Sequence, residues 1–309
     1  MTKKAWICPG QGAQHPGMGK DFYERHAAAR EIFDRADAVL GIPLTKWIFE
    51  GDADRVNATD VAQPGIFVTS VAILAVLAEQ LGAKPAEGDA TAGLSLGEYT
   101  ALWAAGAIAF EDAVRLVRAR GTYMQAASEA QPSGMSSVIG LEYDAIREAC
   151  VEASSAGIVS VANLNAPGQI VISGTHAGLE RASELLKAKG ARRVIPLKVA
   201  GAFHSEVMRP AADRLRADLA KVIIQPPRTR FLPNTTGEWM SSPEEIRGAL
   251  AEQVCAPVLW EKSMRAALAA GYTSFFEPGP GSVLQGLLRK IEPSATVRSF
   301  PDLGALGAS

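Results

Sequence analysis

The chain has 309 residues, of which 48% are hydrophobic and 21% are charged. Its 31 basic and 33 acidic residues leave a formal net charge of -2, so no global basic field predicts nucleic acid or an anionic membrane as a partner. Three widely spaced cysteines, Cys8, Cys150 and Cys255, offer neither a disulfide framework nor a metal-ligand spacing. We therefore expect a soluble, cytoplasmic protein with no bound metal, no signal peptide and no segment that spans a membrane.

The first 130 residues alternate between short strands and helices. Residues 4–8 form an apolar run that predicts a strand, and residues 9–19 form a glycine-rich loop. Helices are expected near 20–40, 62–82 and 111–128, with a turn and a short helix between the last two. Such alternation is typical of an α/β domain built around a parallel sheet.

Residues 131–198 have a pattern of their own. The expected order is strand (134–140), helix (143–153), strand (157–164), strand (169–173), helix (177–189) and strand (192–199). This βαββαβ order is the ferredoxin-like arrangement. We therefore predict a small domain over 131–198, inserted into a large α/β domain made of 1–130 and 199–309.

Residues 93–97 read Gly-Leu-Ser-Leu-Gly and make Ser95 a candidate nucleophile. Two flanking glycines permit the sharp strand-to-helix turn that exposes a serine hydroxyl at the edge of a sheet, although an ordinary turn is the alternative. A serine hydroxyl needs a neighbouring base. Among four histidines, His204 is the best candidate because residues 200–205 surround it with mostly small side chains at a domain junction. A structural histidine in the core is the alternative there.

Arg120 lies on an apolar face of its predicted helix. At about 100° per residue, helical geometry places it among Ala113, Leu116, Val117, Met124 and Ala127. A buried guanidinium requires an anion, either a carboxylate of the protein or the carboxylate of a ligand. The second alternative would make Arg120 a bidentate clamp for an acidic substrate.

Acyl transfer also requires backbone N–H groups that bind the oxyanion. The amide of Leu96, which follows the candidate serine, is one donor, and the Gln11 amide in the loop Pro9-Gly-Gln-Gly12 is the best candidate for the second. A phosphate-binding turn is the alternative for this loop. It lacks both the Lys-Ser/Thr end of a P-loop and the glycine spacing of a dinucleotide-binding loop.

Six motifs occur together and in order along the chain. They are Pro9-Gly-Gln-Gly12, Gly93-Leu-Ser-Leu-Gly-Glu-Tyr99, Arg120-Gly121, Asn163-Leu-Asn-Ala-Pro-Gly-Gln169, Gly201-Ala-Phe-His-Ser205 and Glu277-Pro-Gly-Pro-Gly281. With them, the chain resembles malonyl-CoA:acyl carrier protein transacylases over nearly its full length. The resemblance implies a hydrolase-like α/β domain with a ferredoxin-like small domain. It also implies ping-pong transfer of malonyl from coenzyme A to the phosphopantetheine thiol of acyl carrier protein, in fatty acid or polyketide biosynthesis.

The resemblance assigns roles by position. It makes Ser95 the acylated nucleophile, His204 the base and then the acid, Arg120 the malonate clamp, and Gln11 and Leu96 the oxyanion donors. A carbonyl at Gln253 orients the histidine in place of an acid, and Phe203 and Met124 line the substrate site, where the Phe203 ring would crowd an α-methyl branch. The family implies no cofactor besides the substrate malonyl-CoA, and it favours a monomer.

One position departs from the family pattern, because the residue before the nucleophile is usually histidine and here is Leu94. This residue is not the base in the family, so we expect activity to survive in the presence of Leu94. The acyl preference or the rate is what we expect Leu94 to change. Two rival functions remain: an acyl-thioester hydrolase of the same fold, and a non-catalytic module that binds carrier protein. A basic cluster is either a docking surface for an acidic carrier or a solvated helix end; it comprises Lys187, Lys189, Arg192 and Arg193.

Overall fold

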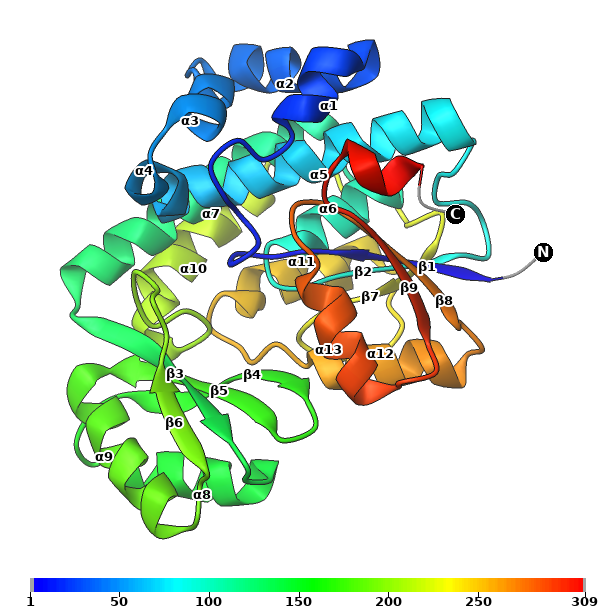
Figure 1. The fold of residues 1–309 in the computed structure, drawn as a ribbon. Coiled ribbons are helices and arrows are strands. Elements are labelled where there is room, and N and C mark those ends of the chain that lie inside the picture. Colours follow the sequence, from blue (N-terminus) through cyan, green and yellow to red (C-terminus); the bar gives the residue numbers. More distant parts are fainter. Residues whose placement is uncertain (1–2, 308–309) are drawn as a thin grey trace.

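Two sheets organise the computed structural model, which describes residues 3–307 (Figure 1). The larger sheet is wholly parallel, with the spatial order β7 (Arg230–Leu232), β2 (Ala90–Gly93), β1 (Lys4–Cys8), β8 (Ser274–Pro278) and β9 (Thr296–Phe300). Because all five strands run the same way, their carboxyl ends meet at one edge. The loops at that edge come from distant parts of the chain, and this is where α/β sheets bind ligands.

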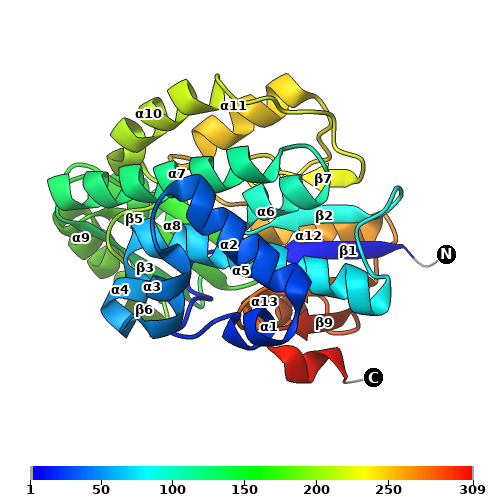
Figure 2. The same ribbon diagram turned by 90° about the horizontal axis from the view of Figure 1, so that it is seen from above.

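Helices cover both faces of the parallel sheet (Figure 2). Alternate residues of β1 point to opposite faces, so that Trp6 and Cys8 join one core and Ala5 and Ile7 join the other. The first core includes α5 (Thr59–Leu81), α6 (Gly97–Ala104) and α7 (Phe110–Ala130), and the second includes α12 (Trp260–Ala269) and α13 (Val283–Ile291). The remaining helices outside the small sheet are α1 (Lys20–Arg25), α2 (Ala27–Leu40), α3 (Leu44–Glu50), α4 (Ala53–Asn57), η1 (Glu206–Met208), α10 (Arg209–Leu219), α11 (Pro243–Gln253) and η2 (Leu303–Leu306).

The smaller sheet is antiparallel and forms the green lobe of Figure 1. Its spatial order is β4 (Val159–Ala166), β5 (Gln169–Thr175), β3 (Ser133–Ile139) and β6 (Arg193–Pro196), and it packs against α8 (Tyr143–Ala153) and α9 (His176–Ala188). The chain order is βαββαβ, so the predicted fold class is confirmed for both sheets. All six elements lie within 131–198, the range predicted for the inserted domain.

A backbone bridge joins the small sheet to the large domain. Val258, just before α12, pairs in parallel with Asn163 of β4. The Leu164 N–H donates to the Val258 carbonyl at 2.9 Å, and the Val258 N–H donates to the Ala162 carbonyl at 2.8 Å. These bonds fix β4 against the large domain in addition to the two chain connections.

Helix α5 corrects the sequence predictions in two ways. It begins at Thr59 instead of 62, although Pro64 lies inside it. Pro64 has no N–H for the carbonyl of Asp60, and the Arg118 guanidinium donates to that carbonyl instead. The sequence prediction also overlooked that α5 is long and apolar enough, by length and composition, to cross a membrane. However, 89% of its apolar stretch is buried inside the fold, as expected of a core helix that is hydrophobic on all sides.

Candidate active site

Ser95 lies in the turn between β2 and α6, at the carboxyl edge of the parallel sheet. Its φ is 53°, a left-handed conformation that serine seldom adopts. Both flanking glycines are required by close packing. A Cβ on Gly93 would overlap the Gly97 carbonyl, and a Cβ on Gly97 would overlap the Cys8 carbonyl. The turn therefore has the geometry of a nucleophile elbow, with its hydroxyl lifted from the sheet.

His204 binds the Ser95 hydroxyl. Its Nε2 is 2.8 Å from Ser95 Oγ, and its Nδ1 is 2.7 Å from the backbone carbonyl of Gln253. A carbonyl oxygen can only accept a hydrogen bond, so Nδ1 carries the proton and Nε2 presents a lone pair to the serine. This is the tautomer that a general base requires. Like Ser95, His204 has a left-handed backbone, with φ 60°.

Arg120 lies behind the serine with only 1% of its surface exposed. Its Nη2 donates to Ser95 Oγ and to Gln253 Oε1, each at 3.0 Å, and its Nη1 donates to Gln63 Oε1 at 2.5 Å. Within residues 3–307 these hydrogen-bond partners are all neutral, and Nε has none. Among the described residues, no protein carboxylate is therefore hydrogen-bonded to Arg120. The guanidinium faces the serine, and none of its hydrogen bonds goes to a negatively charged group.

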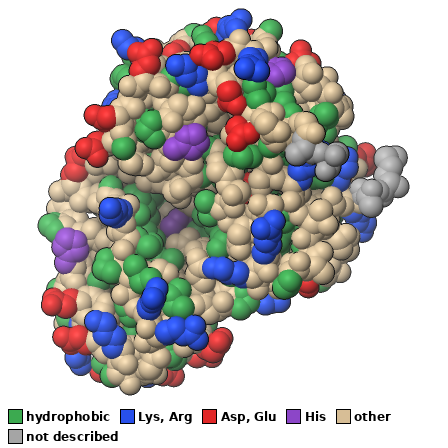
Figure 3. All heavy atoms as spheres, in the orientation of Figure 1, with side chains coloured by type: hydrophobic (Ala, Val, Ile, Leu, Met, Phe, Trp, Pro, Cys, Tyr) green, Lys and Arg blue, Asp and Glu red, His purple; other side chains and the backbone are tan. Residues whose placement is uncertain are grey.

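A cavity of about 720 Å³ opens between the two domains beside Ser95, on a face that Figure 3 shows to be hollowed. The predicted site residues that line it are Gln11, Ser95, Met124, Phe203 and His204, and Leu94 lines it as well. The other three predicted residues, Leu96, Arg120 and Gln253, are buried. The structure therefore brings all the predicted site residues to one place.

The loop that holds Gln11 is fixed by a side chain of its own. Gln14 Oε1 accepts from the Gly12 N–H at 2.7 Å, and Gln14 Nε2 donates to Asn57 Oδ1 at 2.8 Å. Among residues 3–307, no hydrogen bond occupies the N–H of Gln11 or of Leu96. Both donors are therefore free to bind an oxyanion, and their role remains a prediction.

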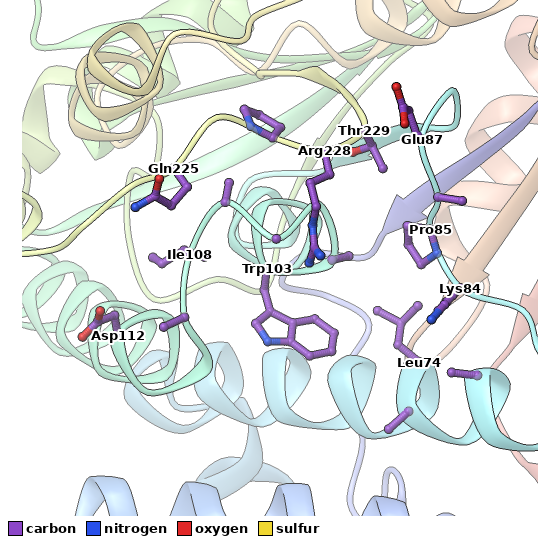
Figure 4. Close-up of a pocket in the computed structure, with 18 of the residues that line it drawn as sticks. Leu74, Lys84, Pro85, Glu87, Trp103, Ile108, Asp112, Gln225, Arg228 and Thr229 are labelled. Carbon is purple, nitrogen blue, oxygen red and sulfur yellow. The ribbon is translucent and has the colours of Figure 1, made fainter.

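A larger cavity, of about 1160 Å³, lies at the opposite edge of the parallel sheet (Figure 4). Lys84 precedes β2 and Arg228 precedes β7, so this cavity is at the amino ends of the strands. Trp103, from the end of α6, lines the same cavity. No predicted site residue lines this second cavity, and we therefore assign the chemistry to the smaller one.

Comparisons with known proteins agree with this geometry. The family model of the acyl transferase domain matches residues 5–300. The chain belongs to the acyl transferase family. It is 45% identical, over 94% of this chain and 91% of the relative, to a malonyl CoA-acyl carrier protein transacylase of Bacillus subtilis (strain 168). These matches confirm the family that the six motifs predicted.

Solved structures of similar proteins extend the comparison to the fold of this acyl transferase. An acyl carrier protein S-malonyltransferase from Vibrio cholerae superposes with a TM-score of 0.93 at 38% identity, covering 99% of both chains. A malonyl-transacylase in complex with its type II PKS acyl-carrier protein superposes with a TM-score of 0.93 at 37% identity, covering 99% of this chain and 98% of that one. The fold of this chain is therefore that of these relatives.

Three buried polar residues beside the serine received no role in the sequence predictions, namely Gln63, Glu98 and Asn234. Gln63 binds Arg120, as described above. Glu98 Oε2 accepts from the Gln253 side-chain amide, and burial raises the pKa of the Glu98 carboxyl to about 7, although the hydrogen bond from Gln253 opposes that rise. The acyl transferase thus surrounds its serine with a connected network of amides and one carboxyl.

The basic cluster lies at the end of α9 and the start of β6, where its side chains are exposed. Lys189 Nζ pairs with Glu148 Oε2 at 3.2 Å. This placement is compatible both with carrier docking and with a solvated helix end.

The His204 ring makes the stability of this acyl transferase depend on pH. Burial, with the Arg120 charge adding to it, lowers the pKa of His204 from 6.5 to about 4. Between these two values the unfolded chain binds a proton that the folded state excludes, so this group makes the free energy of unfolding rise with pH over that window. The raised pKa of Glu98 has the opposite effect on the free energy of unfolding, which it lowers as the pH rises. The contribution of His204 is therefore obtained by comparing the wild type with a variant that lacks this histidine.

We therefore expect the stability advantage of the wild type over His204→Asn to grow between about pH 4 and pH 6.5. Asparagine does not titrate and tolerates a left-handed backbone, which makes it a suitable replacement. Urea unfolding of both proteins across this range measures the difference. A difference that does not vary with pH would show that the pKa of His204 is not lowered.

Proposed function

We propose that this acyl transferase moves a malonyl group from coenzyme A to the phosphopantetheine thiol of an acyl carrier protein, through an acyl-enzyme on Ser95. The observation that carries the proposal is the buried Arg120 guanidinium, 3.0 Å from Ser95 Oγ and hydrogen-bonded to neutral groups alone. An acyl group that ends in a carboxylate satisfies this charge while its thioester carbon lies at the serine. The names of the relatives, malonyl CoA-acyl carrier protein transacylases, support the same substrate.

In the first half-reaction, His204 Nε2 takes the proton of Ser95 Oγ as the oxygen attacks the thioester carbon. The amides of Gln11 and Leu96 bind the resulting oxyanion, each contributing about 10² to 10³ in rate. The carbon–sulfur bond then breaks, and His204 gives its proton to the departing coenzyme A thiolate. The malonyl group remains on Ser95 as an ester, with its carboxylate on Arg120.

The second half-reaction reverses these steps with a different thiol. His204 removes the proton of the carrier's phosphopantetheine thiol, the thiolate attacks the ester, and Ser95 Oγ leaves with the proton from His204. Gln253 keeps the ring oriented throughout, because its backbone carbonyl accepts from Nδ1 at 2.7 Å. A neutral carbonyl suffices here, since burial already favours the neutral imidazole that starts each half-reaction.

Two cavity residues bear on acyl preference. The Phe203 ring lines the cavity next to His204 and is only 5% exposed, so it leaves little room for an α-methyl branch on the acyl group. Leu94 lines the same cavity, and an apolar side chain there supplies no hydrogen bond to the substrate. We further propose a cytoplasmic monomer that needs no cofactor and acts in fatty acid or polyketide biosynthesis.

The experiment that tests this function follows the fate of malonyl-CoA with and without holo carrier protein. We expect malonyl-carrier to form, with little free malonate in either case, because the second step requires a thiol bound in the cleft. Apo carrier, which lacks the phosphopantetheine thiol, is the matched control and should accept nothing. Malonate release that is independent of carrier would identify a hydrolase, and no release of coenzyme A would identify a non-catalytic carrier-binding module.

A further inference from the structure

Asn234 binds both ends of the strained turn that carries Ser95. Its Oδ1 accepts from the Ser95 N–H at 2.6 Å, and its Nδ2 donates to the Gly93 carbonyl at 2.6 Å. The residue is fully buried. One planar amide therefore satisfies a donor and an acceptor of the turn, and both bonds are short.

The side chain of Asn234 is itself held in place. Strand β7 pairs with β2 in parallel, and Asn234 follows β7 at the same sheet edge as the serine turn. Its backbone N–H donates to Glu98 Oε2 at 3.2 Å, and its carbonyl accepts from the Leu259 N–H at 2.9 Å. Because both backbone groups of Asn234 are hydrogen-bonded, its backbone is fixed, and the side-chain amide is held in position to bind the turn.

These bonds matter because the turn has an unfavourable backbone. A serine at φ 53° persists only where the surroundings enforce that conformation. Gln253 Nε2 binds the Ser95 carbonyl at 2.9 Å, while Asn234 binds the Ser95 N–H. Since the Ser95 N–H is occupied by Asn234, the turn presents the free N–H of Leu96 to an oxyanion.

We infer that Asn234 is a positioning residue for acylation: it holds the turn so that Ser95 Oγ stays 2.8 Å from His204 Nε2 and the Leu96 N–H faces the reacting carbon. The inference rests on the proposed function, because it concerns the rate at which Ser95 is acylated. Asn234 does not line the cavity, so it acts through the turn and leaves substrate binding to other residues.

Rapid-quench measurement of acylation by malonyl-CoA, without carrier, tests the inference. We expect Asn234→Ala to lower the acylation rate about 10²-fold, which is the cost of shifting a reacting atom such as Ser95 Oγ by about 1 Å. The malonyl-CoA concentration that gives half the maximal rate should be nearly unchanged. Thr236→Val is the matched control, because Thr236 lies in the same loop and its hydroxyl is hydrogen-bonded, within residues 3–307, to the backbone of Glu238 alone. It should acylate at the wild-type rate.

Asn234→Asp gives a readout that loss of packing would not produce. An ionised carboxylate still accepts from the Ser95 N–H but repels the Gly93 carbonyl, whereas a protonated one donates its O–H to that carbonyl and restores both bonds. The titratable groups around this position are Glu98 on α6, Arg120 on α7 and His204. Burial and the Glu98 carboxyl raise the pKa of the introduced group. The ratio of variant to wild-type rates should therefore rise as the pH falls, and taking the ratio removes the titrations that the two proteins share.

The outcomes separate the inference from the function on which it rests. A wild type that forms no adduct on Ser95 would remove the proposed function. An acylating wild type with an equally fast Asn234→Ala variant would remove the inference alone. If Asn234→Ala does not fold, as judged by circular dichroism, the pH ratio of Asn234→Asp decides, and a ratio that is constant with pH overturns the positioning role.

Discussion

Replacement of Ser95 by alanine is expected to abolish the covalent malonyl adduct and to lower transfer by about 10⁴ to 10⁶-fold, the range seen when serine nucleophiles are removed. Ser95 Oγ is the atom on which the site converges, since His204 Nε2 lies 2.8 Å from it and Arg120 Nη2 lies 3.0 Å from it. Alanine keeps the turn and its glycines but has no atom that can attack a thioester. Any residual rate would then come from bound malonyl-CoA reacting directly.

Intact-protein mass spectrometry after incubation with malonyl-CoA measures the adduct, and peptide mapping locates it. Ser173→Ala is a useful control, because Ser173 is also a fully buried serine but belongs to the small sheet. It should acquire the adduct as the wild type does. An adduct that persists in Ser95→Ala would show that another residue is the nucleophile.

Replacement of Arg120 by alanine is expected to cost malonyl transfer about 3 to 5 kcal/mol, or roughly 10² to 10⁴-fold in kcat/KM. The reason is that the substrate carboxylate would enter a buried site and find no cation, while Gln63 and Gln253 offer only neutral groups. Acetyl-CoA has no such carboxylate, so the kcat/KM for acetyl transfer should change little. The variant thus loses selectivity for malonyl as well as rate.

Steady-state kcat/KM values for malonyl-CoA and acetyl-CoA, measured for the same preparations, give this selectivity directly. Arg115→Ala is the matched control, since Arg115 is on the same helix, is exposed, and forms only a 3.9 Å pair with Asp112. It should keep both values. Equal losses for the two acyl groups in Arg120→Ala would mean that the arginine supports the fold and not the substrate.

The features that sequence predicts well here are local. The pentapeptide around Ser95 and the apolar helix face around Arg120 each reflect the geometry of a single turn or helix, so spacing alone is enough to make both residues candidates. The βαββαβ order of the small domain is equally readable, because each element has its own apolar pattern. His204 required more, namely a recognised chemical need for a base and a short list of histidines to choose from.

The features that escaped prediction depend on contacts between distant segments. Strand β7 has three residues, and its identity comes from pairing with β2 and not from its own pattern. Asn234 follows that strand and binds Ser95 across 139 positions of sequence. A signal did exist, since polar residues just beyond the carboxyl ends of parallel strands frequently belong to the functional site. That signal can be used only once β7 has been recognised as a strand.

The start of α5 escaped for a similar reason. In the predicted range 62–82, Pro64 falls in the first turn of the helix, where proline is well tolerated, whereas the observed helix begins at Thr59 and places Pro64 beyond that turn. Arg118, on α7, donates to the carbonyl that Pro64 leaves without its helical partner. That compensation is tertiary, so no reading of the helix sequence alone could supply it.

The left-handed backbones of Ser95 and His204 have an evolutionary consequence. At φ 53° and 60°, glycine would relieve backbone strain at both positions, and methionine in place of Arg120 would remove a buried charge that has no ion pair among residues 3–307. Each of these replacements would remove a local source of strain or desolvation, and each would end the proposed chemistry. Selection that acted on local stability alone would therefore favour replacement of Ser95, His204 and Arg120, and we expect the three to remain together only where their proposed roles outweigh that cost.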